Sequence, residues 1–183
     1  HRDLHSFPTR RSSDLGSVRT DNCYGTVQWP NVLGWFDRNI RPGMHCLDIG
    51  CGTGIFSFEM GLRGAKVLGI DPCESYLDVA KSRGCENCNF QIAPLGTPEA
   101  FEMIPKAYFD LALISDALLF SFFPVSRRDI ANPSLILNGI KNSLHPGGAF
   151  VSVEPHGDFY LAPWMGQPES PWTEKNSASA TQD

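Results

Sequence analysis

The sequence predicts an α/β fold: a Rossmann-like, doubly wound, mainly parallel sheet with helices on both of its faces. Short apolar runs alternate along the chain with segments of helical period, as expected for strands that are buried on both faces. A glycine cluster at residues 50–54 directly follows the first of these runs, and Asp71 ends the second. Strands joined by helices run parallel with right-handed crossovers, so both features should lie at the carboxyl edge of the sheet, where such folds bind ligands.

The expected elements begin with a helix over residues 30–40, in which Pro30 suits the first turn and Val32 and Phe36 share an apolar face. Apolar runs bounded by turn residues predict the strands, at residues 46–49, 66–70, 89–92, 109–115 and 149–153. Helical periods fill the gaps between the strands, at residues 55–62, 74–83, 98–103 and 133–144. Gly84 is expected to end the second of these helices.

The first fifteen residues, HRDLHSFPTRRSSDL, match a translated stretch of a common sequencing adapter letter for letter. We therefore expect residues 1–15 to be an adapter-derived artefact without ordered structure, and a Ser- and Arg-rich leader or transit peptide is the alternative. One domain is expected over residues 16–165, with a cofactor-binding core at residues 30–155. The polar residues 166–183 predict a disordered tail.

Acidic side chains dominate the charge balance. The sequence contains 20 Asp and Glu against 15 Lys and Arg, and this balance argues against a nucleic-acid groove. The most apolar window, residues 109–125, is interrupted by Asp110 and Asp116 and is too short to span a bilayer. We expect a cytoplasmic enzyme that acts on a small molecule, with no nucleic-acid, membrane or obligate protein partner.

Six cysteines are scattered through the expected strands and loops. Cys85 and Cys88 are the one pair with C-x-x-C spacing, but a structural zinc site needs further ligands, and no second pair supplies them. In the simpler interpretation Cys88 packs as a small hydrophobic side chain at the start of a strand, and zinc binding or a redox role is the alternative. We predict no metal site and no disulfide framework.

The glycine loop after the first strand suits two classes of cofactor, dinucleotides and S-adenosylmethionine. Glycines between a strand and a helix let the backbone approach a ligand and aim free amides of the helix N-terminus at an anion. Both classes also use an acid such as Asp71 to bind the hydroxyls of a ribose. The spacing separates them, because the dinucleotide fingerprint is G-x-G-x-x-G, whereas Gly50, Gly52 and Gly54 form G-x-G-x-G and Ile55 replaces the third glycine.

Three stretches together resemble a known family. The segment LDIGCGTG with the later GID is similar to the class I S-adenosylmethionine-dependent methyltransferases, in particular to their small-molecule, ubiquinone-biosynthesis-like branch. The segment YFDLALISDALL is similar to the fourth-strand motif of that family. NSLHPGGAFVSVEP is similar to its helix, Pro-Gly-Gly turn and fifth strand, so the resemblance covers roughly residues 25–155.

The resemblance implies S-adenosyl-L-methionine as the cofactor and indicates which residues hold it. Asp48 would attract its ammonium group, and Asp71, at a solvated strand end, would hold the ribose without contributing to stability. Backbone amides of residues 50–54 would approach the methionine part. The expected cofactor-binding residues are Asp48, Gly50, Cys51, Gly52, Thr53, Gly54, Asp71, Pro72, Cys73, Leu95 and Ser115.

The catalytic residues stay unknown at this stage, because methyl transfer from a sulfonium depends mainly on holding the acceptor in line. His156 and Asp116 are the candidates for a base. Related sequences often carry a Glu-His pair where this chain has Leu119 and Phe120, which weakens any carry-over of a catechol-type substrate. The expected function is methyl transfer to an O, N or C nucleophile of a small molecule. An NAD(P)-dependent oxidoreductase and a catalytically silent, cofactor-binding interaction module are the alternatives.

The chain is expected to lack the last two strands of the family fold. Only 29 residues follow Glu154, and they are rich in proline and polar residues rather than in a strand pattern. The fifth strand, AFVSVE, would then be an uncovered and largely apolar edge, and the isolated chain should associate at working concentrations.

Overall fold

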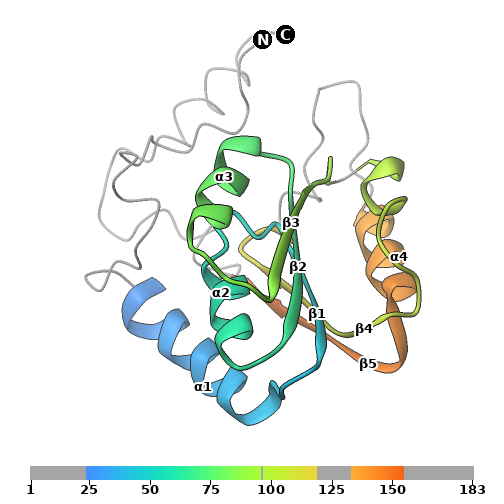
Figure 1. Cartoon of the computed structure of the whole chain (residues 1–183). Coiled ribbons are helices and arrows are strands. Elements are labelled where there is room, and N and C mark those ends of the chain that lie inside the picture. Colours follow the sequence, from blue (N-terminus) through green and yellow to red (C-terminus); the bar gives the residue numbers. More distant parts are fainter. Residues whose placement is uncertain (1–23, 96, 119–132, 155–183) are drawn as a thin grey trace, which may run out of the picture. The chain divides into compact units, whose positions relative to one another are not determined.

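The computed structural model describes residues 24–95, 97–118 and 133–154. They contain a five-stranded sheet in the order β3-β2-β1-β4-β5, in which every neighbouring pair is parallel (Figure 1). The strands are β1 (His45–Ile49), β2 (Lys66–Asp71), β3 (Cys88–Ile92), β4 (Phe109–Ser115) and β5 (Leu144–Val153). The chain builds outward from β1 in one direction and then in the other, so the predicted doubly wound sheet is confirmed, with its switch point between β1 and β4.

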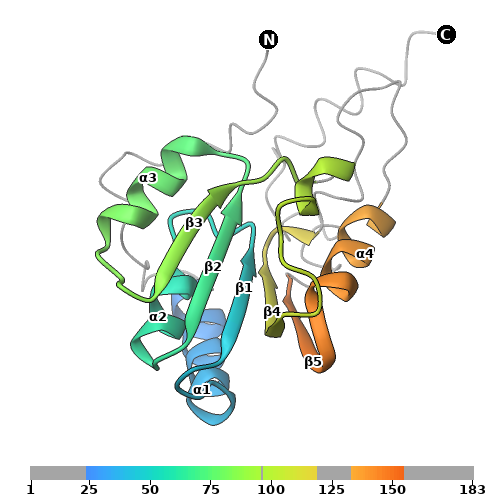
Figure 2. The same cartoon turned by 45° about the vertical axis from the view of Figure 1, so that its right-hand side comes forward.

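Helices cover both faces of this sheet, as the sequence predicts. Figures 1 and 2 show α1, α2 and α3 on one side of the strands and α4 on the other. A π-helix, η2, leads directly into α1, and a short 3₁₀ helix, η3, follows β3. The helical elements are η2 (Tyr24–Gln28), α1 (Trp29–Asn39), α2 (Ile55–Leu62), α3 (Glu74–Ser82), η3 (Pro98–Phe101) and α4 (Pro133–Ser143).

Two apolar cores explain why the strands read as continuous apolar runs. Successive side chains of a strand point to opposite faces of the sheet. Leu111 and Leu113 of β4 therefore join the cluster under α1 and α2, while Ala112 and Ile114 join the cluster under α4. All four residues are almost fully buried, which fixes the register of β4.

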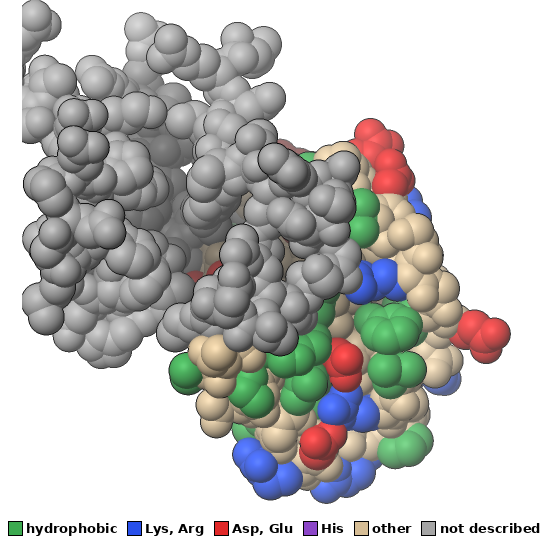
Figure 3. Space-filling model, turned by 90° about the vertical axis from the view of Figure 1, so that its left-hand side faces the viewer, with side chains coloured by type: hydrophobic (Ala, Val, Ile, Leu, Met, Phe, Trp, Pro, Cys, Tyr) green, Lys and Arg blue, Asp and Glu red, His purple; other side chains and the backbone are tan. Residues whose placement is uncertain are grey.

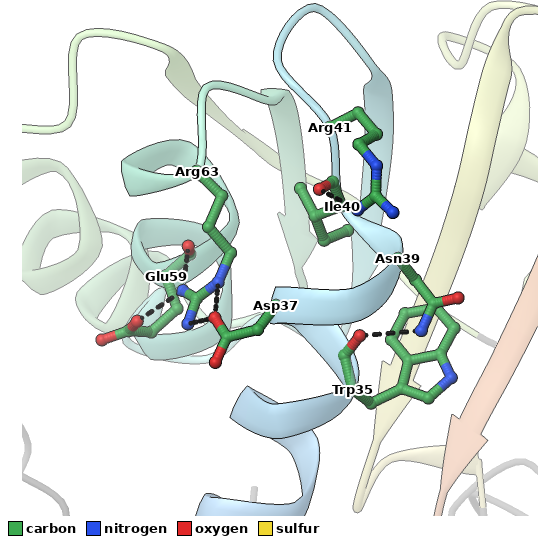
Figure 4. Close-up of polar contacts among 7 residues, drawn as sticks. All are labelled: Trp35, Asp37, Asn39, Ile40, Arg41, Glu59 and Arg63. Atoms are coloured by element: carbon green, nitrogen blue, oxygen red, sulfur yellow. Dashed lines mark hydrogen bonds and ion pairs between the residues drawn. The ribbon is translucent and has the colours of Figure 1, made fainter.

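A polar clamp fastens α1 to α2 (Figure 4). The Arg63 guanidinium, just after α2, lies 2.6 Å from Asp37 of α1 and 2.8 Å from Glu59 of α2. Its carbon also lies 5.8 Å from the centre of the buried Phe36 ring. Partly exposed ion pairs such as these contribute little to stability singly, so their main effect here is to fix how α1 lies along α2.

The structure differs from the sequence prediction at two places in the backbone. The π-helix at Tyr24–Gln28 precedes the expected helix and was not predicted. The strand β5 begins at Leu144 rather than at residue 149, because Leu144 already pairs with Phe109 before a shift of register. Most of the other element boundaries differ by one residue or not at all.

The prediction that Cys88 packs as a free thiol is wrong. Cys85 and Cys88 form a disulfide in the turn between α3 and β3, where their Cα atoms are 5.2 Å apart. Gly61 of α2 makes room for this disulfide, because a Cβ there would lie only 2.8 Å from the Cys88 sulfur. Among the described residues, no group of three or more His, Cys, Asp or Glu side chains could hold a metal ion.

Several sequence predictions concern residues outside the described ranges. They include the artefact at residues 1–15, the tail at residues 166–183, and the Leu119–Phe120 departure. Within the described ranges, no helix is long and apolar enough to cross a membrane. On the side shown in Figure 3, the described Lys and Arg side chains are interspersed with Asp and Glu rather than gathered into a basic field.

Candidate functional site

Loops from three strands converge at the carboxyl edge of the sheet. Gly50, directly after β1, lies so close to the loop after β4 that a Cβ on it would be 2.6 Å from the Cβ of Ala117. The same Cβ would be 3.7 Å from Leu95 in the loop after β3. Gly50 has a positive φ of 69°, so both its conformation and this close approach require glycine. The convergence predicted from the parallel topology is therefore present.

A cavity of about 160 Å³ opens at this convergence. Its walls come from β1, the glycine loop, the first turn of α2 and the end of β4. The lining residues are Asp48, Gly50, Cys51, Thr53, Ile55, Phe56, Ser115 and Asp116. Five of the predicted cofactor residues and one predicted catalytic candidate are thus together. The remaining predicted residues lie beside the cavity or in neighbouring loops, and His156 lies outside the described residues.

Asp48, near the end of β1, is buried in the floor of the cavity with 2% of its surface exposed. Its Oδ2 accepts a hydrogen bond of 2.6 Å from the Ser57 hydroxyl in α2. Burial, together with the negative charge of Asp71, raises the pKa of Asp48 to about 6, against the lowering effect of the Ser57 hydrogen bond. No basic side chain of the described residues forms an ion pair with Asp48.

Asp71 does not occupy the solvated position that the sequence predicted. Only 6% of its surface is exposed, and its two carboxylate oxygens hold two loops together. Oδ2 accepts from the Gly52 amide at 2.9 Å, and Oδ1 accepts from the Cys73 amide at 2.8 Å. The premise that removal of Asp71 uncovers no buried partner is therefore wrong, and we expect its removal to destabilise the fold because two backbone donors would lose their acceptor. A carboxylate has about four lone-pair sites, which is more than these two amides occupy.

The amides of the glycine loop are largely used within the protein. Gly50 and Cys51 both donate to the Ile70 carbonyl, at 2.8 and 3.0 Å, and Gly52 donates to Asp71. Gly54 donates to the Cys51 carbonyl at 2.9 Å. The expectation that this loop aims free amides at an anion is therefore wrong for these four residues. A pyrophosphate needs such donors, so this loop is poorly suited to a dinucleotide.

The second and third glycines serve different purposes. Gly54 starts α2 in a left-handed conformation, and a Cβ on it would lie 2.8 Å from Ala80 and 3.0 Å from the Phe90 ring. Gly54 is therefore required by packing between α3 and β3. Gly52 also has a positive φ, of 53°, but no atom lies within 4 Å of its Cβ position. Of these two, only Gly52 has open space beside it.

Two residues at the site were missed by sequence reasoning. Arg83, which follows α3, donates to the Thr53 carbonyl at 2.6 Å and so helps to hold the glycine loop in place. Gln28, at the end of the π-helix, donates to Asp116 Oδ2 at 2.8 Å and to Ser115 Oγ at 3.1 Å. No local pattern marks either residue, since each acts across more than 25 residues of sequence.

The charges around the cavity favour a cationic ligand. Asp48 and Asp116 both line it, and among the described lining residues there is no Lys or Arg. Burial raises the pKa of Asp116 as well, against the hydrogen bonds from Gln28 and Ser115. Taking a carboxylate charge out of water without a basic neighbour costs free energy in the ligand-free protein. A positively charged ligand group lowers this cost. The positively charged sulfonium and ammonium groups of S-adenosylmethionine suit these two carboxylates, whereas a negatively charged pyrophosphate would be repelled by them.

Comparison with known proteins agrees with this chemistry. A family model described as a methyltransferase domain matches residues 40–180. The ubiquinone biosynthesis O-methyltransferase of Leptothrix cholodnii is 43% identical over 128 residues, covering 68% of this chain and 51% of the relative. That of Pseudomonas savastanoi pv. phaseolicola is 30% identical over 136 residues, covering 72% of this chain and 54% of the relative. The chain thus spans about half the length of these curated relatives.

Solved structures give the same fold. An S-adenosylmethionine-dependent methyltransferase from Mesorhizobium loti is 28% identical, with a TM-score of 0.61 over 78% of this chain and 59% of that chain. The [4+2]-cyclase SpnF is 19% identical, with a TM-score of 0.57 over 75% of this chain and 48% of that chain, and shows a likeness of fold alone. Together with the matched family model, these findings place the chain in the class I S-adenosylmethionine-dependent methyltransferase family, as its sequence predicted.

Proposed function

We propose that this chain binds S-adenosyl-L-methionine and transfers its methyl group to an O, N or C nucleophile of a small molecule. The observation that carries the proposal is the cavity at the carboxyl edge of the sheet, where Asp48 and Asp116 face a space without basic side chains among the described lining residues. A doubly wound fold can host several chemistries, so the charges of the site are stronger support than the fold. An oxygen nucleophile is favoured, because the two curated relatives are O-methyltransferases.

Five described residues at or beside the cavity have a proposed role toward the cofactor. Asp48 attracts the ammonium group, and Asp71 accepts from the ribose hydroxyls while it holds the Gly52 and Cys73 amides. Gly52 gives the cofactor room to approach, and Pro72 and Leu95 flank the adenine. Bound S-adenosylmethionine supplies a methyl group on a positively charged sulfur, which makes the methyl carbon electrophilic.

The acceptor side of the cavity has an apolar wall. Phe56 lines the cavity, and its ring stacks on Trp29 of α1 with 5.4 Å between centroids. The size of about 160 Å³ suits part of a small molecule rather than a polymer. A cytoplasmic location and the absence of nucleic-acid or obligate protein partners stay predictions from composition.

Isothermal titration of the chain with S-adenosylhomocysteine and, separately, with NAD⁺ tests the proposal. We expect saturable binding of S-adenosylhomocysteine at one site and no binding of NAD⁺. Asp48→Asn should weaken this binding, whereas Asp110→Asn, at the opposite edge of the sheet, should leave it unchanged. Binding of NAD⁺ in preference to S-adenosylhomocysteine would overturn the cofactor assignment. A screen of methyl acceptors with radiolabelled S-adenosylmethionine then distinguishes an enzyme from a silent binding module.

A further inference from the structure

The turn that precedes α1 reaches across to the cavity. It is a π-helix, Tyr24–Gln28, and such turns are rare and recur at functional sites. Its last residue, Gln28, directs its side-chain amide to the end of β4, which is 88 residues away in sequence. There the Nε2 donates to Asp116 Oδ2 at 2.8 Å and to Ser115 Oγ at 3.1 Å.

The position of Gln28 is set from two sides. The next residue, Trp29, stacks on the cavity-lining Phe56. Farther along α1, the pair between Asp37 and Arg63 fastens the helix to α2 (Figure 4). The glutamine amide therefore approaches Asp116 from a helix whose packing is already determined.

Asp116 has an uncommon backbone conformation for its residue type. Its φ is 53°, and Asp116 and Ala107 are the only non-glycine residues with positive φ in the described part of the chain. The Asp116 amide donates to the Val153 carbonyl at 2.9 Å, and the following Ala117 packs against the Gly50 position. Left-handed backbone persists at non-glycine residues where surrounding contacts over-determine it, often at functional sites. Here it places the carboxylate in the wall of the cavity.

The other titratable groups of the cavity are less suited to accept a proton from a methyl acceptor. Asp48 lies deeper, is 2% exposed and already accepts from Ser57. Burial holds Cys51 in its neutral thiol form, because its pKa lies far above the ordinary value. Asp116 lines the same space but is only partly buried, so an acceptor can reach it.

We propose that Asp116 is the catalytic base that accepts the proton of the methyl acceptor, and that Gln28 is the positioning residue that holds its carboxylate. This inference rests on the proposed function. The oxygen or nitrogen atom of the acceptor's O–H or N–H group forms a bond to the donated methyl carbon. At the same time the carbon–sulfur bond of the sulfonium breaks and leaves its electron pair on sulfur. The acceptor's proton passes to a carboxylate oxygen of Asp116 and later to solvent. The Gln28 amide donates to the charged carboxylate without exchanging a proton itself.

A carboxyl titration of the full chain tests the Gln28 contact without any turnover. The carbon-13 signal of the Asp116 carboxyl group is followed against pH with S-adenosylhomocysteine present, in the wild type, Gln28→Met and Gln28→Glu. Removing the donated hydrogen bond should raise the pKa of Asp116 in Gln28→Met, and the added negative charge should raise it further in Gln28→Glu. The control is Asn31→Ala, which loses an exposed side-chain bond to the Val27 carbonyl and should not move this pKa. An unchanged pKa in both Gln28 variants would overturn the positioning role.

Methyl transfer from radiolabelled S-adenosylmethionine to the acceptor that the screen described above identifies tests the base. Asp116→Asn should lower kcat, measured at saturating S-adenosylmethionine, by about 100-fold or more. In Gln28→Met the acid limb of the plot of kcat/KM against pH should shift to higher pH, by the same amount as the measured pKa of Asp116. Full activity of Asp116→Asn would overturn the base assignment, as would an Asp116 signal that titrates without effect on the rate. A wild type that does not bind S-adenosylhomocysteine contradicts the proposed function instead, and binding with an unmoved pKa contradicts this inference alone.

Discussion

The two edges of the sheet place carboxylates in opposite electrostatic surroundings. At the amino edge, Asp110 of β4 accepts from the His45 amide at 2.7 Å and from the His145 ring at 2.8 Å. These donors lower its pKa. At the carboxyl edge, Asp48 accepts a hydrogen bond from the Ser57 hydroxyl, and its burial nevertheless raises its pKa to about 6. Carboxylates a few residues apart on neighbouring parallel strands are therefore shifted in opposite directions.

The difference distinguishes a structural contact, at Asp110, from a candidate ligand site, at the cavity. The donors around Asp110 belong to the protein, so its charge is stabilised as soon as the chain folds. The charges of Asp48 and Asp116 lie in a cavity without basic side chains among the described lining residues, so folding alone leaves them unfavourable. Groups with such perturbed pKa values cluster at functional sites, and a bound sulfonium or ammonium would supply the missing positive charge.

Asp71→Ala should produce the largest change, because it acts on both the fold and the ligand. Loss of its oxygens leaves the Gly52 and Cys73 amides without their carboxylate, which should cost roughly 2 to 5 kcal/mol in the free energy of unfolding. The affinity for S-adenosylhomocysteine should fall at least about tenfold. Urea denaturation and isothermal titration measure the two effects. Asp71→Asn, which keeps one acceptor oxygen, should lie between the wild type and Asp71→Ala in both. Equal stability of all three proteins would contradict the loop-binding role.

The glycine loop allows a second test, because two of its glycines differ in surroundings. Gly54→Ala places a methyl group against Ala80 and Phe90, and should lower the free energy of unfolding by about 2 to 4 kcal/mol. Gly52→Ala meets no neighbour within 4 Å. It should cost only about 1 kcal/mol of stability, from its positive φ. Its larger effect should be on S-adenosylhomocysteine affinity. Thermal denaturation and titration of both variants measure the contrast, and a greater loss of stability in Gly52→Ala would refute it.

These glycines also show what sequence reasoning could reach. The spacing of Gly50, Gly52 and Gly54 between an apolar run and a helical period predicted the loop, the cofactor class and the edge of the sheet. It could not separate packing from ligand contact, because Ala80 and Phe90, which crowd Gly54, are far away in sequence. The strands were predicted well because they too have a local pattern: a strand that is buried on both faces has a continuous apolar sequence.

The missed features all depend on long-range contacts. Gln28 precedes the predicted helix and carries no local signal, yet the fold places it on Asp116. Asp71 ends a strand as predicted, but its burial follows from how two loops close over it. The Cys85–Cys88 disulfide joins residues whose spacing was noted but whose sulfur positions depend on the turn between α3 and β3. Local pattern thus located the site, whereas its hydrogen bonds required the tertiary structure.

The pH dependence of stability should distinguish Asp48 from Asp110. The pKa of Asp48 is raised in the folded state, from 3.8 to about 6, so below pH 3.8 the carboxyl is protonated in both states and carries no penalty. As pH rises from about 4 to about 6, the unfolded state loses this proton first, and stability falls by on the order of 2 to 3 kcal/mol. Asp48→Asn should lack this decline, which urea denaturation of the ligand-free protein across that range would measure. A parallel decline in both proteins would contradict the buried charge.

His145→Gln, at the amino edge, should have the smallest effect, and its pH dependence should lie at higher pH than that of Asp48. The two ring nitrogens of His145 face only acceptors, the Pro146 carbonyl at 2.7 Å and Asp110 at 2.8 Å, so the doubly protonated ring satisfies both. Its pKa is therefore raised, first by the Pro146 carbonyl and then by Asp110. The stabilisation is complete below the unfolded pKa of 6.5 and is lost as pH rises through the higher folded value. Because the ring is exposed, we expect a small decrease in Tm at about pH 6 that vanishes above the folded pKa. The affinity for S-adenosylhomocysteine should not change, since this contact lies across the sheet from the cavity. A decrease in Tm that grows with pH would contradict the raised pKa of His145. A loss of affinity would show that the two edges are not independent.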